Sequence, residues 1–214
     1  HWRQLGLTGW GWDDVKPLFR KQLDHFLGDS EHHAKGGEWR VEYPRLRWDI
    51  TDAFREAAVQ AGIPKSDDFN TGDNEGCGYF HVNQKLGRRW SSARGFLKPA
   101  MGRSNLRVET GCLVEKIEFE GTRATGIRFV QNGETRLARC RGEVILSAGA
   151  IGSVQLLLLS GVGPAAQLAE HGIATTLDKP GVGENLQDHL QLRLIHKVTG
   201  VTTLNETYRS LFNR

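Results

Sequence analysis

The stretch EVILSAGAIGSVQLLLLSGVGP, residues 143–164, decides the fold class of this chain. It opens on a short apolar run that is typical of a strand buried on both faces of a sheet, which predicts a parallel strand at Glu143–Ser147. Small residues then interrupt the run. A leucine-rich segment follows and predicts a helix at Ile151–Leu159. A buried strand, a turn of small residues and a helix together predict an α/β core.

The small residues between the predicted strand and helix leave the backbone accessible. A helix that begins there directs its free N–H groups and the positive end of its dipole toward the turn. Such a corner favours an anionic group or a planar ring. The sequence therefore predicts that a cofactor approaches the chain at this turn.

A β-meander is predicted upstream of this core, from Leu106 to Leu137. Apolar residues alternate with polar ones in this stretch, which is typical of half-buried strands. Asn132-Gly133 is a preferred two-residue hairpin turn and divides the last two runs. The expected strands include Leu106–Val108, and the meander adds an α+β portion to the α/β fold.

Two amphipathic helices are predicted near the amino end. The first begins at the acidic pair Asp13-Asp14 and carries an apolar face that continues to Leu27, before Gly28. The second, Ile50–Ala61, ends at a glycine. Residues 67–87 are rich in Asp, Asn and Gly without a sustained period, which predicts a long irregular connection.

Composition excludes several classes of protein. The net charge of +3 is small for 214 residues and basic residues are scattered, so no nucleic-acid partner is expected. Three cysteines without CxxC spacing favour neither a disulfide scaffold nor a structural zinc site. The longest apolar run, Leu156–Leu159, is too short for an integral membrane segment. We therefore expect a reducing, cytoplasmic location, with attachment to a membrane surface left open.

The chain contains a single methionine, Met101, and starts at His1. We interpret it as an internal fragment of a longer protein.

Four segments resemble the glucose-methanol-choline (GMC) oxidoreductases, in the order in which that family has them. The segments are GRRWSSARGFLKPA (87–100), NLRVETGCLVEKI (105–117), GAIGSVQLLLLSGVGP (149–164) and PGVGENLQDH (180–189). The third matches one of the two signature patterns of the family, except that Val154 stands where proline is usual. Helix starts accept proline without requiring it, so this difference weakens the match little. The chain is most similar to the choline dehydrogenase-like branch.

The resemblance implies an FAD enzyme that oxidises a CH–OH group of an alcohol, choline-like or another primary alcohol, by hydride transfer to the flavin. It also implies a division into partial substrate-domain and connecting segments (1–90), an FAD-binding-domain segment with the meander (91–189) and the truncated start of a substrate-domain sheet (190–214). The family's first βαβ unit with its GxGxxG motif and its C-terminal catalytic region have no counterpart here. We therefore expect no catalytic residue in this chain, and no activity from it alone.

The resemblance also implies a short set of cofactor-binding residues. The backbone of Val114 is expected to contact the adenine part of FAD. The strand end is expected to pass close to the cofactor, and the loop before His189 is expected near the flavin, without separate roles for its members. The expected residues beyond Val114 are Ser147, Ala148, Gly149, Asn185, Asp188 and His189.

Other interpretations stay open at this point. His189 fits a structural, hydrogen-bonded histidine as well as one half of an acid–base pair. His32-His33 and the spacing from Cys77 to His81 do not provide a ligand set for a metal, and exposed loop residues are expected instead. The chain could also be a non-catalytic binding or assembly module, or a lyase on the same scaffold. Without the family's first strand, apolar strand surface is expected to be exposed, which predicts a homo-oligomer.

Overall fold

The computed structural model describes residues 1–209, which fall into two compact units. Among the described residues, the N-terminal unit comprises 1–107 and 195–209, and the meander unit comprises Val108–Leu194. All six tryptophans lie in the N-terminal unit. The division into 1–90, 91–189 and 190–214 concerns the longer family fold and stays a prediction; residues 210–214 lie outside the described part.

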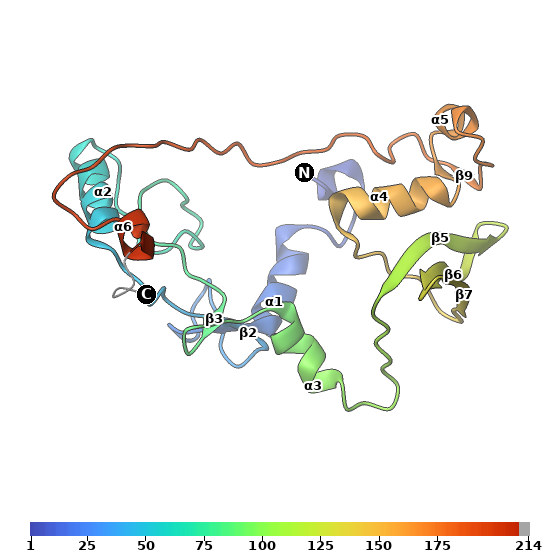
Figure 1. Cartoon of the computed structure of the whole chain (residues 1–214), viewed down its shortest axis with the longest axis horizontal. Coiled ribbons are helices and arrows are strands. Elements are labelled where there is room, and N and C mark those ends of the chain that lie inside the picture. The colour runs from blue at the N-terminus through green and yellow to red at the C-terminus, as the bar shows by residue number, and fades with distance from the viewer. Residues whose placement is uncertain (210–214) are drawn as a thin grey trace. The chain divides into compact units, whose positions relative to one another are not determined.

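Short helices and strands alternate along the chain (Figure 1). The helices are η1 (Arg3–Leu5), α1 (Trp12–Gln22), α2 (Asp49–Gln60), η2 (Ala93–Leu97), α3 (Lys98–Ala100), α4 (Gly149–Leu159), α5 (Ala165–Glu170) and α6 (Leu204–Arg209). The strands are β1 (Leu23–His25), β2 (Trp39–Val41), β3 (Gln84–Lys85), β4 (Arg88–Arg89), β5 (Cys112–Glu120), β6 (Arg123–Gln131), β7 (Glu134–Arg139), β8 (Val162–Gly163) and β9 (Leu177–Asp178). The mixture of helices and strands confirms the predicted fold class.

The first helix is shorter than predicted. α1 begins after Gly11, whose N–H donates to Asp14 Oδ2 at 3.0 Å, and it ends at Gln22. The expectation of a helix to Leu27 was wrong, because Leu23 has an extended backbone and starts β1. β1 pairs in parallel with β2, a partner that lies too far along the chain for local periodicity to reveal.

The next two segments follow the sequence prediction. α2 occupies the predicted amphipathic stretch. Residues 67–87 are mostly irregular, with two isolated bridges, Lys65 to Cys77 and Glu42 to Val82, and the short β3–β4 hairpin at their end.

The predicted meander forms an antiparallel sheet in the order β5-β6-β7. Asn132 and Gly133 form its second turn with φ angles of 53° and 81°, the positive values that a two-residue hairpin turn of this type requires. The prediction that Leu106–Val108 is a strand was wrong, since these residues have no strand partner in the described chain.

Two register shifts interrupt the β5–β6 ladder. Val114 lies opposite Phe129, but Lys116 lies opposite Arg128, so Glu115 is an extra residue in β5. Further along, Thr125 is the extra residue in β6. A bulge leaves its extra residue outside the ladder and increases the local twist.

α4 confirms the predicted helix, but the strand predicted before it was wrong. No strand is formed at 143–147, and Ile145 is 78% exposed. A strand is defined by its ladder partners, and none of residues 1–209 pairs with this run. The apolar sequence is therefore present without the neighbouring strands that would bury it.

Ser160 connects the end of α4 to the meander. Its buried hydroxyl accepts a hydrogen bond from Ile117 N–H at 2.8 Å, and its carbonyl oxygen accepts one from Thr176 Oγ1 at 3.1 Å. The β8–β9 pair and α5 follow, and Leu168 of α5 is fully buried. No helix in the described part of the chain has the length and apolar character needed to cross a membrane.

Candidate functional site

The amino end of α4 is the corner at which the sequence predicts a cofactor. Ser147, Ala148 and Gly149 are all exposed. Gly149 has φ of +81°, and a Cβ at this position would meet no atom within 4 Å. Ala148 provides no side-chain cap, and its own N–H donates to Ser153 Oγ at 3.1 Å. Because the first N–H groups of a helix have no intrahelical partner, this corner can accept an anionic or planar polar group.

A cavity of about 1000 Å³ lies along α4. One wall is the apolar side of α4, and the other is formed by α5 and by the loop at residues 183–187. Asn185, with φ of +56°, is part of this loop and lines the cavity. Asp188 and His189 are exposed outside it, and His189 N–H donates to Asp188 Oδ1 at 2.8 Å.

Val114 lies in β5, half-buried, next to the first bulge of the ladder. The unpaired Glu115 beside it leaves backbone groups outside the ladder, which suits a residue expected to bind through its backbone. Of the predicted cofactor residues, the structure thus places Asn185 against α4 and the 147–149 corner at the start of the same helix. It does not bring Asp188 and His189 to the cavity.

A second polar site lies in the N-terminal unit. We define the histidine cluster as His25, His33, His81 and Asp68. His33 Nε2 and Asp68 Oδ2 are 2.5 Å apart, His81 Nδ1 and Asp68 Oδ1 are 3.7 Å apart, and His25 Nε2 and His81 Nδ1 are 3.2 Å apart. The rings of His25 and His33 stack with centroids 3.8 Å apart. The most exposed of the four side chains is Asp68, at 12%.

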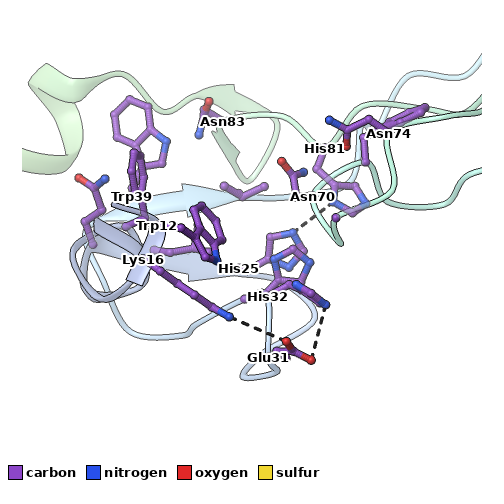
Figure 2. Close-up of a pocket in the computed structure, with 17 residues that line it drawn as sticks. Trp12, Lys16, His25, Glu31, His32, Trp39, Asn70, Asn74, His81 and Asn83 are labelled. Atoms are coloured by element: carbon purple, nitrogen blue, oxygen red, sulfur yellow. Dashed lines mark hydrogen bonds and ion pairs between the residues drawn. The ribbon is translucent and has the colours of Figure 1, made fainter. Parts of the chain in front are cut away.

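The histidine cluster forms part of the wall of a cavity of about 740 Å³ (Figure 2). Figure 2 shows Glu31 between Lys16 and His32, and the Glu31 carboxylate lies 3.9 Å from a nitrogen of each. Trp12 and Trp39 add aromatic surface to the lining. The cavity thus combines aromatic walls with a buried polar side.

Two pKa values in the histidine cluster depart from their ordinary range. Burial, reinforced by the neighbouring His33 and His81, lowers the pKa of His25 from 6.5 to about 4. Burial alone would raise the pKa of Asp68, but hydrogen bonds from Asn70 N–H and from His33 outweigh it and hold this pKa below its ordinary value. His25 is therefore neutral and Asp68 ionised at neutral pH.

The histidine cluster was missed from the sequence. The expectation that His33 and His81 are exposed loop residues was wrong, because both side chains are buried. Up to 56 residues separate the hydrogen-bonded members, so no local spacing could have grouped them. Within residues 1–209 no set of three or more His, Cys, Asp or Glu side chains is arranged to hold a metal ion.

The match to a known family covers most of the chain. Residues 1–191 match the model of the GMC oxidoreductase family, here its N-terminal part. The chain belongs to the GMC oxidoreductase family. Membership agrees with the order of the four motifs and with the predicted α/β fold.

Curated members of the GMC oxidoreductase family include choline dehydrogenases. The chain is 41% identical to the mitochondrial choline dehydrogenase of Homo sapiens over 210 residues, 98% of this chain and 35% of the relative. It is 39% identical to the oxygen-dependent choline dehydrogenase of Brucella anthropi over 204 residues, 95% of this chain and 37% of the relative. The chain thus spans little more than a third of the length of these relatives.

A solved GMC-like structure supports the fold. An FAD-dependent oxidoreductase from Chaetomium thermophilum superposes with a TM-score of 0.81 at 28% identity, over 87% of this chain and 35% of that structure. The arrangement of elements described above is therefore that of a segment within a larger flavoprotein fold.

Proposed function

We propose that this chain is part of an FAD-dependent oxidoreductase that oxidises the CH–OH group of an alcohol, choline or a related primary alcohol. The observation that carries the proposal is the 41% identity to a choline dehydrogenase over 98% of this chain. In such a reaction the flavin accepts a hydride from the alcohol carbon, and the hydroxyl proton passes to a base. We assign no catalytic residue among the 214 residues of this chain.

The contribution of this chain is to bind and orient one edge of the dinucleotide. The exposed 147–149 corner supports this role, because uncapped N–H groups at a helix start and an unobstructed glycine suit a close ligand approach. The bulge beside Val114 supports a backbone contact to the adenine ring. Asn185, in the loop at residues 183–187, lines the cavity along the helix that begins at the corner. Asp188 and His189 are further proposed neighbours of the flavin.

We further propose that the isolated chain self-associates. Ile145 is exposed, and Leu190, Leu192 and Leu194 expose apolar side chains at alternate positions, as on one face of a strand. Sedimentation of the purified chain tests this, and a stable monomer over a hundredfold concentration range would contradict it. The cytoplasmic location stays a prediction.

A chimeric enzyme tests the proposed function directly. The 214 residues replace the matching part of the Brucella anthropi oxygen-dependent choline dehydrogenase, so that the flanking sequence comes from the relative. We expect a chimera that retains flavin and reduces an artificial electron acceptor when choline or a simple alcohol is added.

Two outcomes would contradict the proposal. A folded chimera that retains flavin but shows no alcohol-dependent reduction would favour lyase chemistry. A folded chimera without flavin would favour a non-catalytic module. Circular dichroism of the chimera beside the parent enzyme establishes folding in both cases.

A further inference from the structure

The histidine cluster links three separate segments of the N-terminal unit. His25 belongs to β1, His33 belongs to the loop between β1 and β2, and Asp68 and His81 belong to the segment 66–82. The same segment forms one wall of the 740 Å³ cavity through Phe69, Asn70, Gly72 and Asn74. The hydrogen bonds of the cluster therefore hold a cavity wall in place.

The cluster has a defined direction of proton donation. Leu27 N–H donates to His25 Nδ1 at 3.3 Å, so the neutral His25 ring carries its proton on Nε2 and donates it to His81 Nδ1. His33 Nε2 donates to Asp68, which also accepts from Asn70 N–H at 2.9 Å. In these hydrogen bonds every donor therefore faces an acceptor, as long as the His25 ring stays neutral.

We propose that the histidine cluster is a proton-operated latch, which holds the segment 66–82 over the cavity when His25 is neutral and releases it when His25 is protonated. This inference concerns the N-terminal unit alone and does not rest on the proposed oxidoreductase function.

A second proton on His25 conflicts with its surroundings. Protonation puts an N–H on Nδ1, which then faces the Leu27 N–H, so that two donors oppose each other. The charged ring would also stack on His33 at 3.8 Å. Release of the segment exposes the His25 ring to water, so that the ring can turn away from Leu27 N–H and its charge can be hydrated.

The charged groups around His25 do not relieve this conflict. His33, His81 and the guanidinium of Arg40 on β2 all disfavour a charge on His25, and Asp68 alone favours one. Arg40 is itself paired with Asp24 Oδ2 at 3.1 Å and with Glu42 Oε1 at 3.2 Å. Lys16, Glu31 and His32 also line this cavity, where Lys16 Nζ and His32 Nε2 each lie 3.9 Å from the Glu31 carboxylate.

The segment has fixed ends about which it can open. Cys77 N–H donates to Pro64 O at 2.8 Å and Ser66 N–H donates to Cys77 O at 3.1 Å, which closes the loop 66–77 at its base. Val82 and Glu42 exchange backbone hydrogen bonds at 2.9 Å. Between these points, the His33–Asp68 hydrogen bond holds the loop to the β1–β2 connection, so its loss frees the cavity wall without unfolding the sheet.

Hydrogen–deuterium exchange of the 214-residue chain, corrected for intrinsic rates, tests the latch. We expect exchange of amides in 67–76 to accelerate by at least about tenfold between about pH 6.5 and pH 4.5, because the released state binds a proton that the closed state rejects. The corrected exchange rates of amides in the β5–β7 meander should stay constant over the same pH range.

Variants and a direct spectroscopic measurement complete the test. His25→Gln keeps a donor and an acceptor but cannot titrate, so it should abolish the acceleration. His32→Gln, the same change at a neighbouring side chain without hydrogen bonds to the cluster, should leave it intact. Imidazole ¹⁵N shifts of the wild-type chain should show neutral His25 with its proton on Nε2 at about pH 5.5. A charged His25 at that pH, or pH-independent exchange in 67–76, would overturn the proposal.

Discussion

The histidine cluster and the corner at the start of α4 use polar groups in opposite ways. In the cluster, four buried ionisable side chains are hydrogen-bonded to one another within the chain. At the corner, residues 147–149 are small, exposed and without a side-chain cap. The cluster therefore contributes to the fold of the N-terminal unit, whereas the corner has no side-chain cap for its backbone donors and is the proposed place of a ligand.

This difference predicts how the two regions respond to mutation. A buried ionised group loses much of its stabilisation when one partner is removed. An exposed backbone corner can be altered with little effect on stability, while binding changes strongly. The predictions below separate these two behaviours, beginning with the largest expected change in the free energy of unfolding.

Asp68→Ala should destabilise the N-terminal unit by about 3 kcal/mol, because it leaves the buried Nε2–H of His33 without its acceptor. Urea unfolding followed by tryptophan fluorescence measures this, since all six tryptophans lie in that unit. Asp67→Ala is the matched control, because Asp67 is 82% exposed and should change stability by less than about 0.5 kcal/mol. Equal effects of the two variants would contradict the structural role of the cluster.

Acidification should destabilise the same unit. The pKa of His25 is lowered from 6.5 to about 4, so between these values the unfolded chain binds a proton that the folded chain does not. The contribution of His25 to the free energy of unfolding is fully present above about pH 6.5. It falls by ~1.4 kcal/mol per pH unit as the pH drops toward 4, a total loss of up to about 3 kcal/mol. The lowered pKa of Asp68 adds a further loss below its ordinary value of 3.8. Urea midpoints measured at several pH values for wild type and His25→Gln test this prediction. The same dependence of the midpoint on pH in both proteins would contradict it.

Ser160→Ala should destabilise the meander unit by about 2 kcal/mol, because Ile117 N–H loses its buried acceptor. The change should appear in far-UV circular dichroism during urea unfolding, while the tryptophan transition of the other unit keeps its midpoint. Ser153→Ala removes a hydrogen bond to the exposed Ala148 N–H and should cost less than about 1 kcal/mol. A larger loss of stability from Ser153→Ala than from Ser160→Ala would show that Ser160 does not connect α4 to β5.

Ala148→Glu should leave stability nearly unchanged, because a carboxylate near a helix start contributes at most about 1 kcal/mol and is favourable there. In the chimera, the same change should lower flavin affinity at least about tenfold, since it sets a negative charge against the proposed cofactor edge. Ala166→Glu, in the first turn of α5, is the matched control for charge and position. Equal flavin content of the two variants would argue against a cofactor at the corner.

The smallest effect is expected from FAD on the chain alone. The corner offers a few hydrogen bonds, which do not offset the entropic cost of ordering a large flexible ligand. Flavin fluorescence titration of the 214-residue chain should detect no binding at micromolar concentrations, and no alcohol-dependent reduction should occur. Tight binding would mean that residues 147–149 form much more of the cofactor site than one edge.

Local sequence patterns predicted the elements that depend on neighbouring residues. α2 and α4 followed from apolar spacing and from glycine boundaries, and the Asn132-Gly133 turn followed from its backbone requirement. Each of these is determined within about a dozen residues. The exposed corner of small residues at the start of α4 was predictable for the same reason, and its contact with a cofactor stays a prediction.

Non-local pairing explains the expectations that failed. Leu23–His25 fits a helical period equally well, and only the distant Trp39–Val41 makes it a strand. The 144–146 run has the composition of a buried strand but no ladder partner in the described chain. The histidine cluster joins residues up to 56 positions apart, so its burial and its pKa shifts depend on the tertiary fold.

The two bulges of the β5–β6 hairpin have a consequence for changes in chain length. The extra Glu115 in β5 shifts the pairing by one residue, and the extra Thr125 in β6 shifts it back, so both ends of the hairpin share one register. Deletion of either residue alone would shift the pairing register at one end of the hairpin by one residue, which turns the side chains there to the opposite face of the sheet. Deletion of both would restore a regular ladder of unchanged register. Insertions and deletions in this hairpin should therefore be tolerated in pairs, one in each strand, rather than singly.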